Sequence, residues 1–272
     1  MKDCIINLKD YNMEQINALR CICEKDINIE KVKDNRISAE NMKVVADLLE
    51  KNIDVSEYAK DGFNTAQLKE IASGIEDNVD VSTYALKEFS DAQMSELHYG
   101  LLKEIDINVY KNPKFNEKQM HMIALGLTKN LNVEIYAKEH FNASQMNEIY
   151  MGLVNDIDVT IYAKEKYSDK QMMLLRETLE ENKPVENLID KNYSYEQMIE
   201  IKEGLNDNIN ISEYDDIVYT AKQMREIRLG LKDNLDVSQY KNPETKESEM
   251  KMKRLKLSMI QKKDNIMAKF KK

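Results

Sequence analysis

The sequence predicts an all-α fold, an α-solenoid of about ten short repeats. A bulky or aromatic residue recurs every 26 residues from Tyr11 onward, with no insertion in the series. A helix-capping pattern follows each of these residues, and a second cap lies later in the same unit. Gly (7) and Pro (3) are scarce among the 272 residues, which disfavours a loop-rich β fold. A fixed period of this length is typical of stacked units that contact only their neighbours.

The recurring residue defines the units. Units begin at residues 11, 37, 63, 89, 115, 141, 167, 193 and 219, and Thr245 continues the count weakly. We therefore divide the chain into a helical-repeat solenoid, residues 1–244, and residues 245–272, a degenerate last unit with a basic amphipathic C-terminal helix. We expect the helix register to be lost from Thr245.

The first half of each unit predicts a three-turn helix. A small polar residue followed three places later by Gln, as at Asn142 and Gln145, forms a capping box. Apolar residues follow at helical spacing, as at Met146 and Ile149. We expect this helix to end near an Asn such as Asn78, because Asn tolerates the left-handed conformation that follows many helices.

The second half of each unit predicts a short α or 3-10 helix. Asp begins a short apolar segment ending in Tyr, as in "DVSTYA" at Asp80, "DVTIYA" at Asp158 and "DVSQYK" at Asp236. We expect Asp to cap this helix and Val and Tyr to face inward. The alternative is a short strand of a leucine-rich horseshoe. The L-x-x-L-x-L-x-x-N signature of that fold is missing, which favours the helix.

Six glycines recur in the middle of the first helix, where Gly is unfavourable relative to Ala. They are Gly74, Gly100, Gly126, Gly152, Gly204 and Gly230. Because they lie a full period apart, they form no phosphate-binding loop. We expect each glycine to let the short helix or the next unit approach closely.

The pattern resembles short two-helix repeats of the Q-M-x-E-I-R-x-G-L and L-D-V-S-x-Y-A type. Such repeats occur in largely uncharacterised proteins of Clostridia-like bacteria and their mobile elements. The resemblance is closest in "KQMREIRLGLKDNLDVSQYKNP" from Lys222, and it is good from Phe63 to Tyr162. It implies the two-helix solenoid architecture and no particular activity.

Two units depart from the pattern. The first unit has Ile22 for Gly and Val32 for Tyr, as an end cap would. The unit from Tyr167 has Thr178 for Gly, Pro184 for Asp and Leu188 for Tyr, and we expect the superhelix to bend there.

No catalytic motif is present, and we expect neither enzymatic activity nor a cofactor or metal. The chain has no G-x-S-x-G, H-E-x-x-H, Walker loop or C-x-x-C pair. We expect His98, His121 and His140 to be solvated surface residues rather than zinc ligands. Asp residues recur at the turns between helices. We interpret them as helix caps, with a calcium-binding ladder as the alternative.

Charge is distributed unevenly. Residues 245–272 hold ten Lys and Arg against three Asp and Glu, a net charge of +7; since the whole chain carries −9, residues 1–244 carry −16. An acidic body disfavours direct nucleic-acid binding. It would attract a basic nucleic-acid-binding protein instead, or act only to keep the protein soluble.

The C-terminal segment "KMKRLKLSMIQKKDNIMAKF" predicts a basic amphipathic helix. Such a helix can lie on a membrane, bind an acidic partner or cover the last repeat. We favour the third role, which would hide Leu255, Met259 and Phe270. "MKDCIINLKDYN" has no apolar leader segment, and no run of eighteen apolar residues occurs. With three cysteines near one end, we expect a cytoplasmic protein without stable membrane insertion.

One set of outward positions predicts a partner-binding surface. The eleventh place of the unit points away from the Met–Ile stripe, yet it is apolar in three successive units. The candidate residues are Tyr99, Leu125 and Met151, with Met122, Tyr150 and Val154 beside them. Contact between adjacent repeats is the alternative role for this row. We expect a helical-repeat scaffold that binds a protein. The alternative is an inhibitor, encoded by a phage or mobile element, that blocks a host defence nuclease through an acidic, nucleic-acid-mimicking surface.

Overall fold

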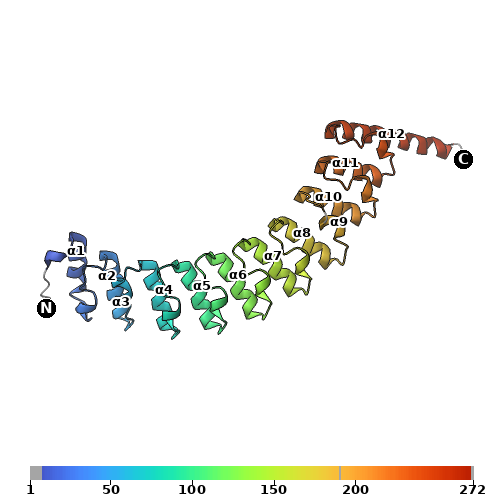
Figure 1. Ribbon diagram of the computed structural model, residues 1–272. Helices are drawn as coiled ribbons and strands as arrows, with labels where there is room; N and C mark the ends of the chain where they lie inside the picture. Colours follow the sequence, from blue (N-terminus) through green and yellow to red (C-terminus); the bar gives the residue numbers. More distant parts are fainter. Residues whose placement is uncertain (1–7, 190, 271–272) are drawn as a thin grey trace. The chain divides into compact units, whose positions relative to one another are not determined.

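The computed structural model describes residues 8–189 and 191–270. The chain divides into two compact units, residues 1–146 (unit 1) and 147–272 (unit 2). Helices occur throughout the described residues, and no strand is found among them. The predicted all-α repeat fold is confirmed, because within each unit successive helices pack side by side in chain order (Figure 1).

The α-helices vary little in length apart from two short ones and the last. They are α1 (Met13–Ile22), α2 (Ala39–Leu49), α3 (Ser56–Lys60), α4 (Thr65–Glu76), α5 (Asp91–Leu102), α6 (Glu117–Thr128), α7 (Ala143–Val154), α8 (Asp169–Glu180), α9 (Glu186–Ile189), α10 (Tyr195–Asn206), α11 (Ala221–Lys232) and α12 (Glu247–Phe270).

Short 3-10 helices alternate with most of them. They are η1 (Leu8–Asp10), η2 (Ile29–Lys31), η3 (Val81–Thr83), η4 (Ile107–Val109), η5 (Val133–Ile135), η6 (Val159–Ile161), η7 (Ile211–Glu213) and η8 (Val237–Gln239). In two repeats the corresponding short helix is α-helical instead, namely α3 and α9.

The start of most long helices is fixed by the predicted capping box, whereas α2 has only the single bond from the Asn41 N–H to the Ser38 side chain. In α6, for example, Asn116 accepts a hydrogen bond from the Gln119 backbone N–H, and the Gln119 side chain accepts one from the Asn116 N–H. These two bonds satisfy amide groups that a helix start otherwise leaves without partners. The same reciprocal pair is found in α1, α4, α5, α8, α10 and α11.

The end of most long helices, from α2 to α11, is fixed by a residue with positive φ. The predicted Asn78, Asn130 and Asn234 have φ values of 58°, 55° and 56°. Asn is among the few residues that adopt this conformation at low cost, so it ends the helix and turns the chain toward the short helix. Glu104 and Asp156 occupy the same place with φ 55°.

The short helices follow the predicted caps. The Asp80 carboxylate accepts a hydrogen bond from the Ser82 N–H, and Asp158 and Asp236 bind the N–H two residues on in the same way. The Tyr that ends each of these helices is buried. This finding confirms both the capping role of Asp and the inward Tyr.

The last helix differs from its expectation in two respects. Met250, 26 residues after Met224, is fully buried, so α12 keeps the helix register beyond Thr245. The expected burial of the apolar tail is wrong for Leu255 and Met259, which are 44% and 73% exposed. The Phe270 side chain lies outside the described part of the chain. Helix α12 docks through Met250 and its polar neighbours, so its apolar stripe is left facing outward.

Candidate functional site

A lock between glycine and tyrosine joins the two helices of a repeat. In α5, a Cβ added to Gly100 would lie 1.9 Å from the Tyr110 hydroxyl oxygen. That hydroxyl donates to the Glu96 backbone carbonyl at 3.1 Å. The ring is therefore held flat against the long helix at the one place where a side chain is missing. The predicted close approach of the short helix is confirmed.

The same lock is present in six repeats. It pairs Gly74 with Tyr84, Gly100 with Tyr110, Gly126 with Tyr136, Gly152 with Tyr162, Gly204 with Tyr214, and Gly230 with Tyr240. Burial raises the pKa of Tyr84, Tyr110, Tyr162 and Tyr214, and it raises that of Tyr240 to about 12. Each of these hydroxyls therefore remains a neutral hydrogen-bond donor at physiological pH.

A second device joins one repeat to the next. Besides closing the capping box, the Gln119 side-chain amide donates to the Phe141 backbone carbonyl at 2.7 Å. The equivalent amides donate to the carbonyl 22 residues on: Gln15 to Ile37, Asn41 to Phe63, Gln67 to Phe89, Gln93 to Phe115, Gln171 to Tyr193, Gln197 to Tyr219 and Gln223 to Thr245. One side chain thus caps its own helix and bonds to its neighbour.

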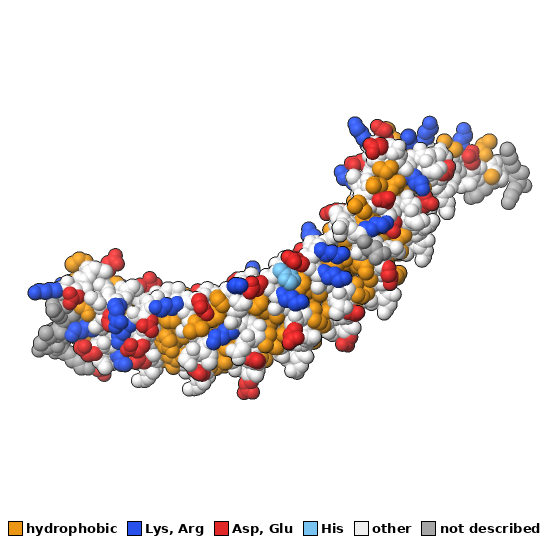
Figure 2. All heavy atoms as spheres, in the orientation of Figure 1, with side chains coloured by type: hydrophobic (Ala, Val, Ile, Leu, Met, Phe, Trp, Pro, Cys, Tyr) orange, Lys and Arg blue, Asp and Glu red, His pale blue; other side chains and the backbone are white. Residues whose placement is uncertain are grey.

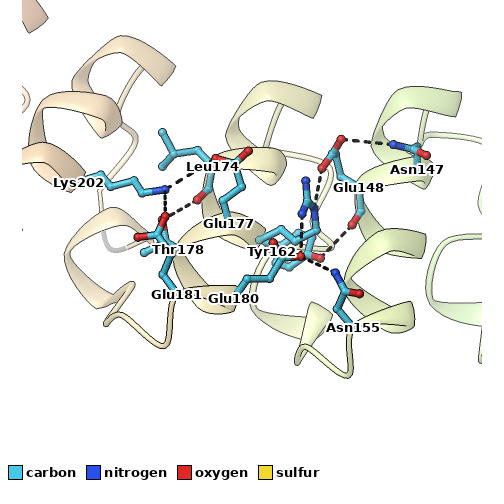
Figure 3. Close-up of polar contacts among 11 residues, drawn as sticks. Asn147, Glu148, Asn155, Tyr162, Leu174, Glu177, Thr178, Glu180, Glu181 and Lys202 are labelled. Atoms are coloured by element: carbon cyan, nitrogen blue, oxygen red, sulfur yellow. Dashed lines mark hydrogen bonds and ion pairs between the residues drawn. The ribbon is translucent and has the colours of Figure 1, made fainter. Parts of the chain in front are cut away.

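Charged side chains add a third link between repeats in unit 2 (Figure 3). Arg176 of α8 binds Glu148 of α7 at 2.9 Å, and Lys202 of α10 binds Glu181 at 3.2 Å. The hydrogen bond from Arg176 lowers the pKa of Glu180, and Asn155 contributes a second bond. Arg176 and Lys202 are the tenth residues of their repeats, and each binds the preceding repeat. The helix face that carries the tenth residue is therefore buried between repeats.

Two of the predicted site residues lie in unit 1. Tyr99 and Leu125, on α5 and α6, are both half-buried. The Tyr99 ring lies 6.4 Å from the His121 ring and is approached by the Lys103 ammonium at 5.7 Å from its centroid. Part of each side chain therefore contacts its surroundings and part faces solvent.

The predicted role of Met122 is wrong. Its side chain is only 9% exposed, and its backbone carbonyl accepts the hydrogen bond of the Tyr136 hydroxyl. Met122 is the eighth residue of the repeat that begins at residue 115, and this position lies at the contact between repeats. The residue belongs to the packed interior and cannot anchor a partner.

The other three predicted residues lie on α7 in unit 2. Met151 and Tyr150 are half-buried, and Val154 is 38% exposed. Tyr150 is the tenth residue of its 26-residue repeat, the position at which Arg176 and Lys202 bind the preceding repeat. Of these three residues, Met151 and Val154, one turn apart on α7, are therefore the two whose side chains are open to a partner.

Sequence reasoning missed one residue of the surface in unit 1. Leu102 lies three residues after Tyr99 on the same face of α5, and it is 48% exposed. The signal was available, because residues three apart are neighbours on a helix. We refer to Tyr99, Leu102 and Leu125 as the α5–α6 surface. Figure 2 shows hydrophobic side chains, interspersed with charged ones, along the face of unit 1 that it presents.

The histidines differ from the expectation of three solvated side chains. His98 is buried, with Nδ1 3.0 Å from a Glu70 carboxylate oxygen and Nε2 3.1 Å from one of Asp77. It takes the tenth place and so acts between repeats as Arg176 does in unit 2. His121 and His140 are exposed, and His121 pairs with Glu96 at 3.0 Å.

Neither a metal centre nor a membrane span is found. Among the described residues, no three His, Cys, Asp or Glu side chains are grouped so as to hold a metal ion. No helix in that part of the chain is long and apolar enough to cross a bilayer. No family model, curated protein or solved structure matches the chain.

Proposed function

We propose that the protein is a non-enzymatic helical-repeat scaffold that binds another protein. The repeats of the chain can be compared with one another, and this internal comparison supports the proposal. In unit 1, α4, α5 and α6 share the Gly–Tyr lock and the capping box. They also share the bond from the capping Gln amide to the backbone carbonyl 22 residues on, which we call the Gln staple. Their eleventh places, by contrast, are Ser73, Tyr99 and Leu125. A constant interior with a varying outer face is typical of repeat proteins that present a binding surface.

The chemistry of the α5–α6 surface fits a protein partner. A Tyr and two Leu side chains combine apolar area with one hydroxyl, and aromatic anchors dominate the binding energy of many protein interfaces. The long axis of each helix is about 18 Å for twelve residues. The surface is therefore suited to an extended segment or a helix of the partner.

The test is a pull-down from a host lysate with three purified proteins. The wild type should retain a defined set of proteins, and Tyr99→Ala with Leu102→Asp should lose them. The matched control is Leu86→Asp with Val109→Asp, which alters two exposed apolar residues of unit 1 outside this surface. If the control loses the same proteins, or the Tyr99 and Leu102 variant keeps them, the α5–α6 surface is not the binding site.

The same experiment separates the protein scaffold from the alternative, an inhibitor that mimics nucleic acid. The net charge of −16 on residues 1–244 motivates that alternative. A mimic would retain a basic nuclease through charge, so its binding would fall steeply with salt and would survive loss of Tyr99 and Leu102. Binding through the α5–α6 surface would show the opposite behaviour.

A cytoplasmic location accompanies this proposal. Cys21 is a free thiol, and it is exposed. Exposed free thiols are typical of a reducing compartment. Fractionation of the source cells would test it, and recovery of the protein outside the cytoplasmic fraction would contradict it.

A further inference from the structure

Helix α12 docks on α11 through one face only. Met250 is fully buried, the Arg254 guanidinium binds the Glu226 carboxylate at 2.7 Å, and the Gln261 amide donates to the Asp233 carbonyl at 3.2 Å. These residues lie four and seven residues apart, which is one and two helical turns, so they line one side of the helix. They account for the attachment of α12 to unit 2.

The opposite side of α12 carries an exposed apolar stripe. Its members are Met252, Leu255, Met259, Ile260, Ile266 and Met267, and all of them are exposed. At about 100° per residue, Met252 and Met259 point away from Met250 and Arg254. We call this set the α12 stripe. Single exposed apolar residues are ordinary, but six on one side of the same helix indicate a contact surface.

The stripe occupies the place where a helix is expected to dock. Glu200 of α10 and Asp207, the residue that follows this helix, bind Arg228 of α11 with oxygen–nitrogen distances of 2.8 and 3.4 Å. In α11 the equivalent Glu226 and Asp233 receive α12. The residues 26 positions further on are Met252 and Met259. Helix α12 therefore presents methionines at the two places where α10 and α11 each hold the following helix.

Two lysines decide what kind of helix fits. Lys256 and Lys263 are exposed and lie one turn after Met252 and Met259, near the middle of the stripe. On a bilayer surface both ammonium groups would reach anionic headgroups, so the choice of a helix as occupant rests on the docking places, which hold a helix on both α10 and α11. A second copy of α12 would bring lysines against lysines. Carboxylates on a partner helix would neutralise both.

We propose that the α12 stripe docks an amphipathic helix of a partner protein, whose apolar residues alternate with Asp and Glu. Its methionines supply adaptable apolar contacts, because the thioether chain fills irregular surfaces. Its lysines select the charge of the occupant. This surface is separate from the α5–α6 surface, so either can exist without the other.

The test uses the full chain and two synthetic helical peptides of about 20 residues, matched to the length of α12. One peptide carries a leucine stripe interspersed with Glu, and the other carries Lys at the same places. The wild type should bind the Glu peptide at least about tenfold more tightly than the Lys peptide. Leu255→Asp with Met259→Asp should abolish this binding. Lys256→Glu with Lys263→Glu should reverse the preference.

The matched control is Ile217→Asp with Val218→Asp, which changes two exposed apolar residues of unit 2 away from α12 and should leave binding unaltered. Vesicles of phosphatidylglycerol and of phosphatidylcholine, and sedimentation of the protein alone, complete the set. Binding to phosphatidylglycerol vesicles with none to the Glu peptide would overturn the proposal, as would a dimer abolished by Leu255→Asp. A large loss of thermal stability in the Leu255 and Met259 variant would also overturn it, since the stripe would then be covered by the chain itself.

Discussion

Two adjacent repeats of unit 1 show what the Gly–Tyr lock does. In the third repeat, Gly74 leaves room for Tyr84, which is fully buried and donates to the Glu70 carbonyl. In the second repeat, Leu48 replaces the glycine, and Tyr58 is only half-buried. Tyr58 packs edge-on against Phe63 instead, at 5.6 Å between ring centroids. A side chain at the glycine place therefore displaces the tyrosine from the long helix.

Two other repeats replace both partners at once. Ile22 and Val32 in the first repeat are buried, and so are Thr178 and Leu188 in the seventh. In each pair the residue that replaces glycine is larger than glycine, and the residue that replaces tyrosine is smaller than tyrosine. The requirement is thus for a combined volume and shape rather than for glycine itself, as expected of a close-packed interior.

Alkaline pH should have the largest effect on stability, because it acts on several of the buried lock tyrosines at once. Burial raises the pKa of Tyr84, Tyr110, Tyr162, Tyr214 and Tyr240 above the value of about 10 that they have in the unfolded chain. The stability that they contribute is fully present below about pH 10 and is lost as the pH rises toward their folded values. We expect helical circular dichroism to be lost above about pH 10, in the same transition as the part of the tyrosinate absorbance that comes from the buried tyrosines. Titration of all tyrosines near pH 10 with helicity retained would contradict this.

The next largest effect should come from transplanting the seventh repeat's pair into the fourth. Gly100→Thr places a side chain against the Tyr110 hydroxyl and should cost about 3 kcal/mol of unfolding free energy. In the background of Tyr110→Leu the same change should cost less than about 1 kcal/mol, because the clash is gone. Urea unfolding of the two single variants and the double variant measures this coupling. Additive costs would show that the two residues act independently.

The Gln staple should contribute less than the lock. Gln119→Ala removes a cap and the donor to the Phe141 carbonyl, and we expect a loss of about 2 kcal/mol. Gln119→Glu keeps the cap acceptor but sets a carboxylate against that carbonyl, so it should be at least as destabilising as Ala. A Glu variant as stable as the wild type would mean that only the cap matters.

The smallest effect distinguishes the two tyrosine environments. Tyr110→Phe loses the buried bond to the Glu96 carbonyl and should cost about 1 kcal/mol. Tyr58→Phe, at a half-exposed hydroxyl, should cost less than about 0.5 kcal/mol. Thermal unfolding of both variants under identical conditions makes the comparison. Equal losses would show that displacement by Leu48 does not weaken the contribution of the hydroxyl.

The sequence predicts the structure of the repeat well, because residues close together in the sequence determine where each helix begins and ends. A cap such as Asn116 with Gln119 and a terminator such as Asn130 act over three or four residues, and both occur as predicted. The bond from Gln119 to the Phe141 carbonyl joins positions 22 residues apart, and the capping pattern does not reveal it. The Gly100–Tyr110 contact was expected as a close approach but not as a specific pair.

The candidate site was predicted less well, because exposure depends on neighbours that a single helix does not reveal. Met122 was expected at the surface and is buried at a contact between repeats. Leu102 was missed although it lies one turn from Tyr99. Burial of Leu255 and Met259 was expected on the assumption that an apolar stripe must dock on its own chain. In fact, α12 uses Arg254 and Gln261 for that contact.

The most direct test of the scaffold proposal is the unfolding free energy of a variant that carries third-repeat residues on the outer face of unit 1. In the triple variant Tyr99→Ser, Leu102→Glu and Leu125→Ser, the eleventh and fourteenth places match Ser73 and Glu76. If these side chains serve a partner and the locks hold the fold, urea unfolding should show a total loss of no more than about 2 kcal/mol, as for partly exposed residues. A total loss above about 6 kcal/mol, the sum for three core truncations, would show that the α5–α6 surface is packed interior and not a binding site.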